Sequence, residues 1–255
     1  MHEWFETPPG RHVLAWERAE FDRAVSDIFG YHALQLGLPE LDALAANRMP
    51  HRWLGLRHLR PLDDGTRRPS LLTDYAALPF EANSLDLVVL PHSLELNLDP
   101  HATLREVERV LVPEGKVVIS CLNPASLWGL RQRRAHLYRR LGFGSLSLPD
   151  AGEFIGYRRL RDWLRLLNFE VEHSHFGCWR PAFTTEHWLQ RTEWMDDAGA
   201  RWWPILGAVY LVVATKRVRG MRLVGKLWKP AKLPATAPGP VANRQPQHEL
   251  REETC

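Results

Sequence analysis

The chain has 255 residues, of which 45% are hydrophobic and 25% charged, and its formal net charge is +3. These values are ordinary for a soluble α/β domain, and the small net charge does not by itself indicate a polyanion partner. The longest apolar run, 205–214, is about half as long as a membrane-spanning helix requires. The N-terminus lacks the apolar core of a signal peptide, so we expect a cytoplasmic protein without an integral membrane segment.

Three cysteines, Cys121, Cys178 and Cys255, are far apart in the sequence and odd in number. They predict no disulfide framework. His173 and His175 precede Cys178 at a spacing that matches no standard zinc pattern, so we expect no metal site.

The first third of the chain alternates between strand-like and helix-like segments. Helical spacing is present over 16–28 and over 38–47, and Gly30 is a stop signal for the first of these helices. Short apolar segments predict strands at 32–37, 52–56 and 71–73, with a polar loop over 60–70.

The middle of the chain predicts a strand, a helix and a second strand. The nearly continuous apolar run 85–90 is typical of a parallel strand buried on both faces. Asp99 and Pro100 suit the start of a helix, which we expect to end at 113–115. Residues 116–122 form the next buried strand, which completes a right-handed βαβ unit.

The remaining segments are more varied. We expect a basic helical stretch over 125–141, a loop over 142–149, a helix over 157–167, an edge strand at 169–173, an irregular Trp-rich region over 176–203 and a strong strand at 207–216. A tail over 229–255 is too polar to bury a core and is expected to be disordered. The predicted domain is therefore 1–228, with a cover region over 125–205.

Several short phrases between residues 74 and 122 occur in a characteristic order. They are Asp74, Leu78-Pro79-Phe80, Ser84-Leu85-Asp86-Leu87-Val88, His92-Ser93-Leu94-Glu95, Leu104-Arg105-Glu106, Arg109-Val110-Leu111 and Pro113-Glu114-Gly115. In this order the sequence resembles the class I S-adenosylmethionine-dependent methyltransferases, in particular the group called methyltransferase type 11.

The resemblance implies an α/β fold with a Rossmann-like, mostly parallel seven-stranded sheet, helices on both faces and a C-terminal antiparallel hairpin. It also implies S-adenosylmethionine as the cofactor, held at the carboxyl ends of the strands. The implied cofactor-binding residues are Gln35, Gly37, His58, Asp74, Tyr75, Leu78 and Leu90. Among them, Asp74 takes the role of the acceptor for the adenine amino group, and Leu78 covers the ring.

Two positions depart from the pattern of this family. The loop after the first strand carries only Gly37 where several glycines are usual, and Gln35 stands where an acid is common. After the second strand, Arg57 and His58 replace the acid that binds the ribose, and Asp63 and Asp64 follow later in the loop. Gly37 and Asp74 also suit an ordinary turn and a cap, respectively.

His92 and Glu95 directly follow the strand 85–90, where the reaction mouth is expected. His92 is the candidate catalytic residue, as a base or as a group that orients the substrate, and packing or loop capping is the alternative. Asp86, at the start of the same strand, is expected to be structural.

Methyl transfer needs no catalytic triad, so the sequence leaves the acceptor open between a small molecule, a quinone-like lipid and an RNA-linked group. Arg131–Arg140 suits a solvated helix face, an anionic membrane surface or a polyanion such as RNA. The tryptophans of 179–203 suit a small core over the sheet edge or a lid on the substrate pocket. The alternative function is a non-catalytic binding or scaffolding relative, while a dehydrogenase is disfavoured because no G-x-G-x-x-G motif follows a strand.

Overall fold

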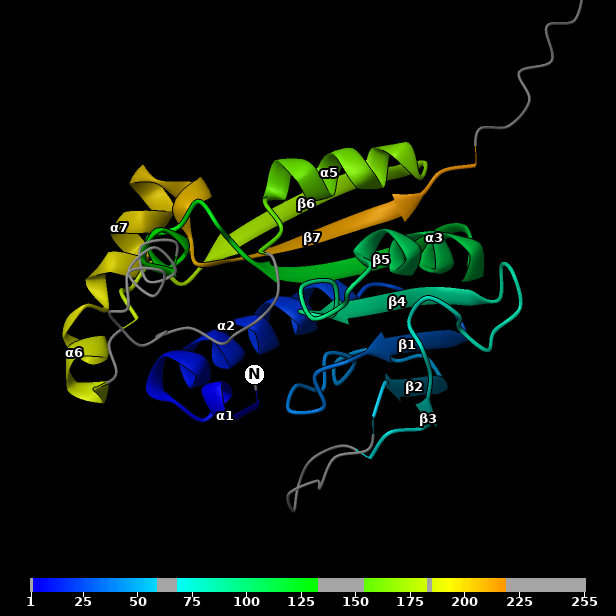
Figure 1. Ribbon diagram of the computed structural model, residues 1–255, viewed down its shortest axis with the longest axis horizontal. Helices are drawn as coiled ribbons and strands as arrows, with labels where there is room; N and C mark the ends of the chain where they lie inside the picture. Colours follow the sequence, from blue (N-terminus) through cyan, green and yellow to red (C-terminus); the bar gives the residue numbers. More distant parts are fainter. Residues whose placement is uncertain (1, 59–67, 133–153, 183–184, 219–255) are drawn as a thin grey trace, which may run out of the picture. The chain divides into compact units, whose positions relative to one another are not determined.

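The computed structural model describes residues 2–58, 68–132, 154–182 and 185–218 (Figure 1). Its strands form a seven-stranded sheet in the order β3-β2-β1-β4-β5-β7-β6. The strands are β1 (His32–Leu36), β2 (His51–Leu56), β3 (Leu71–Leu72), β4 (Leu85–Pro91), β5 (Leu111–Leu122), β6 (Phe169–Gly177) and β7 (Val209–Lys216). The helices are α1 (His2–Phe5), α2 (Pro8–Val25), α3 (Pro100–Val110), α5 (Tyr157–Leu166), α6 (Glu186–Arg191), α7 (Trp194–Trp202) and the 3-10 turn η1 (Pro204–Leu206).

The pairing of the strands confirms the predicted sheet. Strands β1 to β5 are parallel to one another, whereas β7 runs antiparallel to both β5 and β6. The reversal of strand order lies between β1 and β4, which pair with each other through Ala33–Gln35 and Leu87–Val89. In open sheets of this kind, ligands bind beyond the carboxyl ends of the strands at such a reversal.

Buried side chains form one apolar layer on each face of the sheet, because successive residues of a strand point to opposite faces. Leu87, Val89 and Val118 pack with α2 on one face. Alternating with them, Val88 and Leu90 pack with α3 and α5 on the other face. Figure 1 shows α3 and α5 together on one side of the sheet, with α2 on the opposite side. Helices therefore cover both faces, as predicted.

Helix α2 begins earlier than the sequence predicted, at Pro8 rather than at residue 16. Thr7 is its N-cap and accepts a hydrogen bond from the backbone N–H of Gly10, and proline is tolerated in the first turn. The residues of its buried face recur every four positions and are Val13, Glu17, Phe21 and Val25. One carboxylate thus lies within an otherwise apolar stripe.

The helix predicted over 38–47 is wrong, because this segment forms successive turns. The buried side chain of Gln35 holds them: its amide nitrogen donates to three backbone carbonyls, including that of Leu41 at 2.6 Å, and its oxygen accepts from Ala43 N–H. Asn47 closes the segment by donating to the carbonyls of Val25 and Ile28. These side-chain bonds satisfy the backbone groups that a helix would have paired.

Other expectations differ from the structure, or concern residues that it does not describe. Helix α3 ends at Val110, so 113–115 belongs to β5 and does not end the helix. The region 176–203 is not irregular, since it contains α6 and α7, and several of its tryptophans are exposed rather than in a small core. Residues 133–140, the loop 142–149, the tail 229–255 and the boundary at 228 lie outside the described residues.

Candidate functional site

The carboxyl ends of β1, β2 and β4 meet at one edge of the sheet, and direct contacts link the segments that follow them. The backbone N–H of Gly37, after β1, donates to the carbonyl of Gly55 in β2 at 2.9 Å. The hydroxyl of Ser93, after β4, donates to the carbonyl of Leu36 at the end of β1. This edge is where the sequence placed the cofactor crevice.

Gly37 makes a turn that requires glycine. Its φ is +78°, in the region that side chains other than glycine rarely adopt. A Cβ added at this position would lie 2.8 Å from the Ser93 hydroxyl and 3.3 Å from the Tyr75 hydroxyl. The turn therefore brings bare backbone close to the segments after β3 and β4.

Arg57, at the end of β2, spans the same edge. Its guanidinium donates to Asn97 Oδ1 at 2.9 Å, lies 3.4 Å from Asp74 Oδ1 and sits 5.7 Å from the centre of the Tyr75 ring. The Asp74 side chain is 57% exposed, so this carboxylate is accessible from solvent although it already faces a cation. Asp74 also accepts from the backbone N–H of Ala76, which is the capping contact that the alternative interpretation expected.

The other predicted cofactor-binding residues occupy different environments. His58 is exposed at the end of a described segment. Tyr75, Leu78 and Leu90 are buried in the apolar layer beneath α3. The Gln35 amide is used by the turns after β1, and this placement does not support its predicted role in binding the cofactor.

Directly after β4, His92 lies between two carboxylates. Its Nδ1 is 2.8 Å from Glu95 Oε2, and its Nε2 is 2.8 Å from Glu17 Oε1 on α2. The side chains of all three residues are 0–2% exposed. Glu95 also accepts from the backbone N–H of Leu122 at the end of β5, which fixes its position. The sequence had no signal for Glu17, because its partner is distant along the chain.

The environment of His92 strongly favours its protonated form. Burial lowers the pKa of His92, but the carboxylates of Glu17 and Glu95 outweigh this effect and raise it to about 10. For Glu95, burial has the opposite sign and raises the pKa of the carboxyl group. The hydrogen bond with His92 lowers this pKa but does not cancel the effect of burial. His92 also has φ +51°, an unusual conformation for a residue with a side chain, and such strain is concentrated at functional sites.

Several buried polar atoms around His92 have no hydrogen-bond partner among the described residues. They are Trp4 Nε1, Glu17 Oε1 and Oε2, His92 Nε2 and Ser120 Oγ. Glu17 Oε1 and His92 Nε2 face each other at 2.8 Å as an ion pair, which leaves Trp4 Nε1, Glu17 Oε2 and Ser120 Oγ. A buried polar atom without a partner costs about 1–3 kcal/mol, so these three atoms in one region require an explanation.

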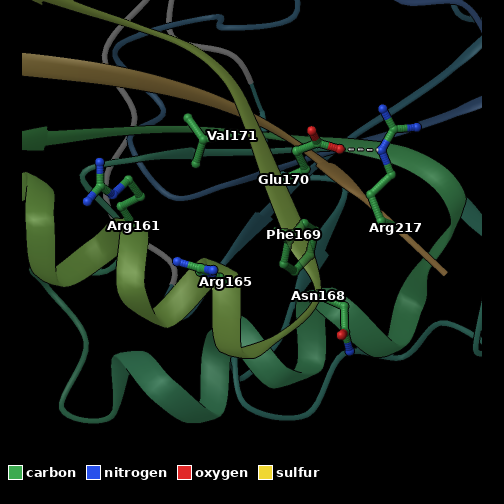
Figure 2. A pocket seen from close by; sticks show the side chains of 7 residues that line it. All are labelled: Arg161, Arg165, Asn168, Phe169, Glu170, Val171 and Arg217. Atoms are coloured by element: carbon green, nitrogen blue, oxygen red, sulfur yellow. Dashed lines mark hydrogen bonds and ion pairs between the residues drawn. The ribbon is translucent and has the colours of Figure 1, made fainter. Parts of the chain in front are cut away.

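A separate pocket of about 540 Å³ lies at the opposite edge of the sheet, where α5 meets the start of β6. Figure 2 shows Arg161 and Arg165 on α5 facing it and Arg217 directed to Glu170. Phe169, which lines the pocket, pairs with Lys216 at the end of β7. Because β7 is antiparallel to β5, this end of β7 lies beside the amino end of β5. It therefore does not belong to the edge that carries His92.

Comparison with known proteins identifies the class to which this fold and site belong. The family described as "Methyltransferase domain" matches residues 60–119. A SAM-dependent methyltransferase from Archaeoglobus fulgidus superposes with a TM-score of 0.55 at 17% identity, covering 80% of this chain and 94% of that one. A second SAM-dependent methyltransferase, from Thermotoga maritima, gives 0.55 at 14% identity, over 85% and 94% of the two chains. At these identities the structures show a shared fold.

The chain belongs to the class I S-adenosylmethionine-dependent methyltransferases, whose cofactor is S-adenosylmethionine. A relative that matches most of its length is the uncharacterized protein YafS of Escherichia coli K12, at 36% identity over 84% of this chain and 80% of the relative. The ubiquinone/menaquinone biosynthesis C-methyltransferase UbiE of Cupriavidus pinatubonensis is 31% identical over 42% of this chain and 43% of that protein. Among the described residues, no helix is both long and apolar enough to cross a membrane.

Residues at the edge of β1, β2 and β4 fit this cofactor in part. The bare backbone at Gly37, where a Cβ would collide with Ser93, is the kind of close approach that a bound ligand requires. The exposed carboxylate of Asp74 suits an amino group. At the end of β2, however, Arg57 places a cation where a hydrogen-bond acceptor for ribose hydroxyls would be needed.

Proposed function

We propose that this chain transfers a methyl group from S-adenosylmethionine to an acceptor that binds at the carboxyl ends of β4 and β5. The observation that carries the proposal is the buried group Glu17–His92–Glu95, directly after β4, beside polar atoms that have no hydrogen-bond partner in the part of the chain that the structure describes. S-adenosylmethionine supplies the methyl group on a sulfonium, so the protein needs mainly to position the acceptor and exclude water.

Each part of the edge has a role in this proposal. The turn at Gly37 lets the cofactor approach the backbone, and Asp74 accepts from the adenine amino group. Glu95 holds the imidazole of His92 through Nδ1, and Nε2 faces the Glu17 carboxylate on α2. Helices α1 and α2 cover His92 and exclude water from it, as expected for a site that must protect a transfer step.

A second candidate, a non-catalytic relative that keeps the fold as a binding module, is favoured by one contact. Arg57 already faces the Asp74 carboxylate, and it stands at the end of β2 in place of a ribose acceptor. In this alternative the Arg57–Asp74 ion pair permanently occupies the position in which the adenosine of the cofactor would bind.

Calorimetric titration with S-adenosylmethionine and S-adenosylhomocysteine separates the two candidates, after any co-purified ligand has been removed. Micromolar binding that disappears in Gly37→Arg supports the methyltransferase. A folded chain that binds neither compound would reject it and favour the binding module. Gly156→Ala is a suitable control, since a Cβ there meets nothing closer than Pro124 at 3.6 Å.

A further inference from the structure

Around His92, polar atoms without a hydrogen-bond partner among the described residues lie beside buried aromatic side chains. The Phe5 ring lies 5.8 Å from the imidazole of His92, and Trp4 lies 5.2 Å from Phe5 and 6.0 Å from Trp128. All of these rings are buried. Ser120 shares this face of β5, because it alternates with Ile119 and aligns with Val118 and Leu122.

The polar atoms of this region differ in what they can bind. The Glu17 carboxylate can only accept hydrogen bonds, and its Oε2 receives none from residues 2–58, 68–132, 154–182 and 185–218. The Trp4 indole can only donate, and the Ser120 hydroxyl can do both. A hydroxyl group is therefore a suitable ligand, because it donates to Glu17 and accepts from Trp4 or Ser120. A carboxylate ligand is disfavoured, since it would lie against the carboxylate of Glu17.

The sequence of α2 supports a specific role for Glu17. It is the only charged residue in the four-residue stripe Val13, Glu17, Phe21 and Val25, which packs onto the sheet. An apolar residue would complete that stripe at no desolvation cost. The contact with His92 occupies Oε1 of Glu17 and leaves Oε2 without a partner among the described residues.

We propose that the region bounded by Trp4, Phe5, Glu17, His92 and Ser120 is the binding site for a planar aromatic ring that carries a hydroxyl group. This inference rests on the proposed function, because it names the class of the methyl acceptor. In the acceptor-free chain the Phe5 ring stands in the place of the ligand ring, and α1, four residues long, holds it there. The ligand hydroxyl donates to Glu17, and its ring packs against Trp4 and Trp128.

Two probes of similar shape test this proposal: catechol, and its dimethyl ether 1,2-dimethoxybenzene, which cannot donate a hydrogen bond. Replacing a buried aromatic ring by alanine leaves a space that can take a small aromatic molecule. In the full chain with Phe5→Ala, we expect calorimetry to give a Kd for catechol at least tenfold lower than in the unmodified chain. The dimethyl ether should bind at least tenfold more weakly than catechol.

The role of Glu17 is tested in the same background. Adding Glu17→Gln to Phe5→Ala should weaken catechol binding at least tenfold, whereas adding Glu20→Gln should leave it unchanged. Glu20 lies on the same helix and pairs with Arg23 and His175 instead. Equal affinity for the two probes, or catechol binding that is insensitive to Glu17→Gln, would overturn the proposal.

Two further measurements keep the test decisive if Phe5→Ala fails to fold. Phe5→Val is a milder variant, and the ¹⁵N resonance of His92 Nε2 in the unmodified chain should shift with saturating catechol but not with the ether. No shift with either probe and no binding by Phe5→Val would reject the site. Titration with S-adenosylmethionine is independent of these results, so catechol binding without cofactor binding would keep the aromatic site and reject only the methyltransferase.

Discussion

Glu17 Oε1 and His92 Nε2 lie 2.8 Å apart, and both side chains are fully buried. The contact joins α2, near the start of the chain, to the segment after β4, where Glu95 approaches the other ring nitrogen at 2.8 Å. Two carboxylates around one imidazole favour its protonated form in a region without solvent.

The stability of the fold should decrease as the pH rises through the alkaline range. Because the pKa of His92 is raised from 6.5 to about 10, the folded state binds the proton more tightly than the unfolded state. This contribution is fully present below pH 6.5 and is lost as the pH approaches 10, with a slope of up to about 1.4 kcal/mol per pH unit. Urea unfolding at several pH values measures it, and His92→Gln should flatten the dependence. An unchanged slope in that variant would assign the effect to other groups.

Removing the charge of Glu17 should destabilise the chain strongly. Glu17→Gln leaves the buried imidazolium with a single carboxylate, and breaking a buried ion pair costs about 3–5 kcal/mol. A double-mutant cycle with His92→Gln should show coupling, because each side chain is costly to bury without the other. The control variant Glu20→Gln should change the free energy of unfolding by less than about 1 kcal/mol, because the partners of Glu20, Arg23 and His175, are exposed to solvent. Additive effects of Glu17→Gln and His92→Gln would contradict the pairing.

Substitution of Gly37 should disturb both stability and cofactor binding. Gly37→Ala places a side chain at φ +78°, and its Cβ lies 2.8 Å from the Ser93 hydroxyl. We expect a loss of about 1–3 kcal/mol in the free energy of unfolding, as for other residues held in this region. Gly37→Arg should abolish S-adenosylmethionine binding in calorimetry. A Gly37→Arg variant with normal affinity would remove this turn from the site.

Loss of the Asp74 carboxylate should weaken cofactor binding more than it weakens the fold. Asp74→Ala removes the proposed partner of the adenine amino group, which is worth about 1–3 kcal/mol, or roughly tenfold to a hundredfold in Kd. The ion pair with Arg57 is largely exposed, so the free energy of unfolding should change by less than about 1 kcal/mol. If only stability falls, Asp74 is a cap for the Ala76 backbone and not a ligand.

Removal of Arg57 distinguishes a competitor from a ligand. If its guanidinium competes with adenosine for Asp74, then Arg57→Ala should tighten S-adenosylmethionine binding several-fold by freeing that carboxylate. Arg57→Lys should retain part of the competition, because lysine keeps the charge without the planar fork. A weaker affinity in Arg57→Ala would show instead that the guanidinium contacts the cofactor.

The sheet and the family were predictable from the sequence, because both depend on local patterns. The apolar runs at 85–90 and 116–122, the cap at Asp99 and the alternation at 169–173 specify β4, β5, α3 and β6 through nearest neighbours in the chain. The ordered phrases between Asp74 and Leu122 indicated the methyltransferase class for the same reason. The fold and the expected edge of the sheet followed from these signals.

The partners of the polar side chains at that edge depend on the tertiary structure. Gln35 had the position of a cofactor ligand, but four hydrogen bonds to the turns after β1 occupy its amide. Helical spacing over 38–47 was overridden by the same bonds. Glu17 had the spacing of a core residue, and its partner His92 is brought to it only when α2 packs across β4. Local pattern predicts which residues form an element, whereas the pairing of buried charges depends on which elements the fold places in contact.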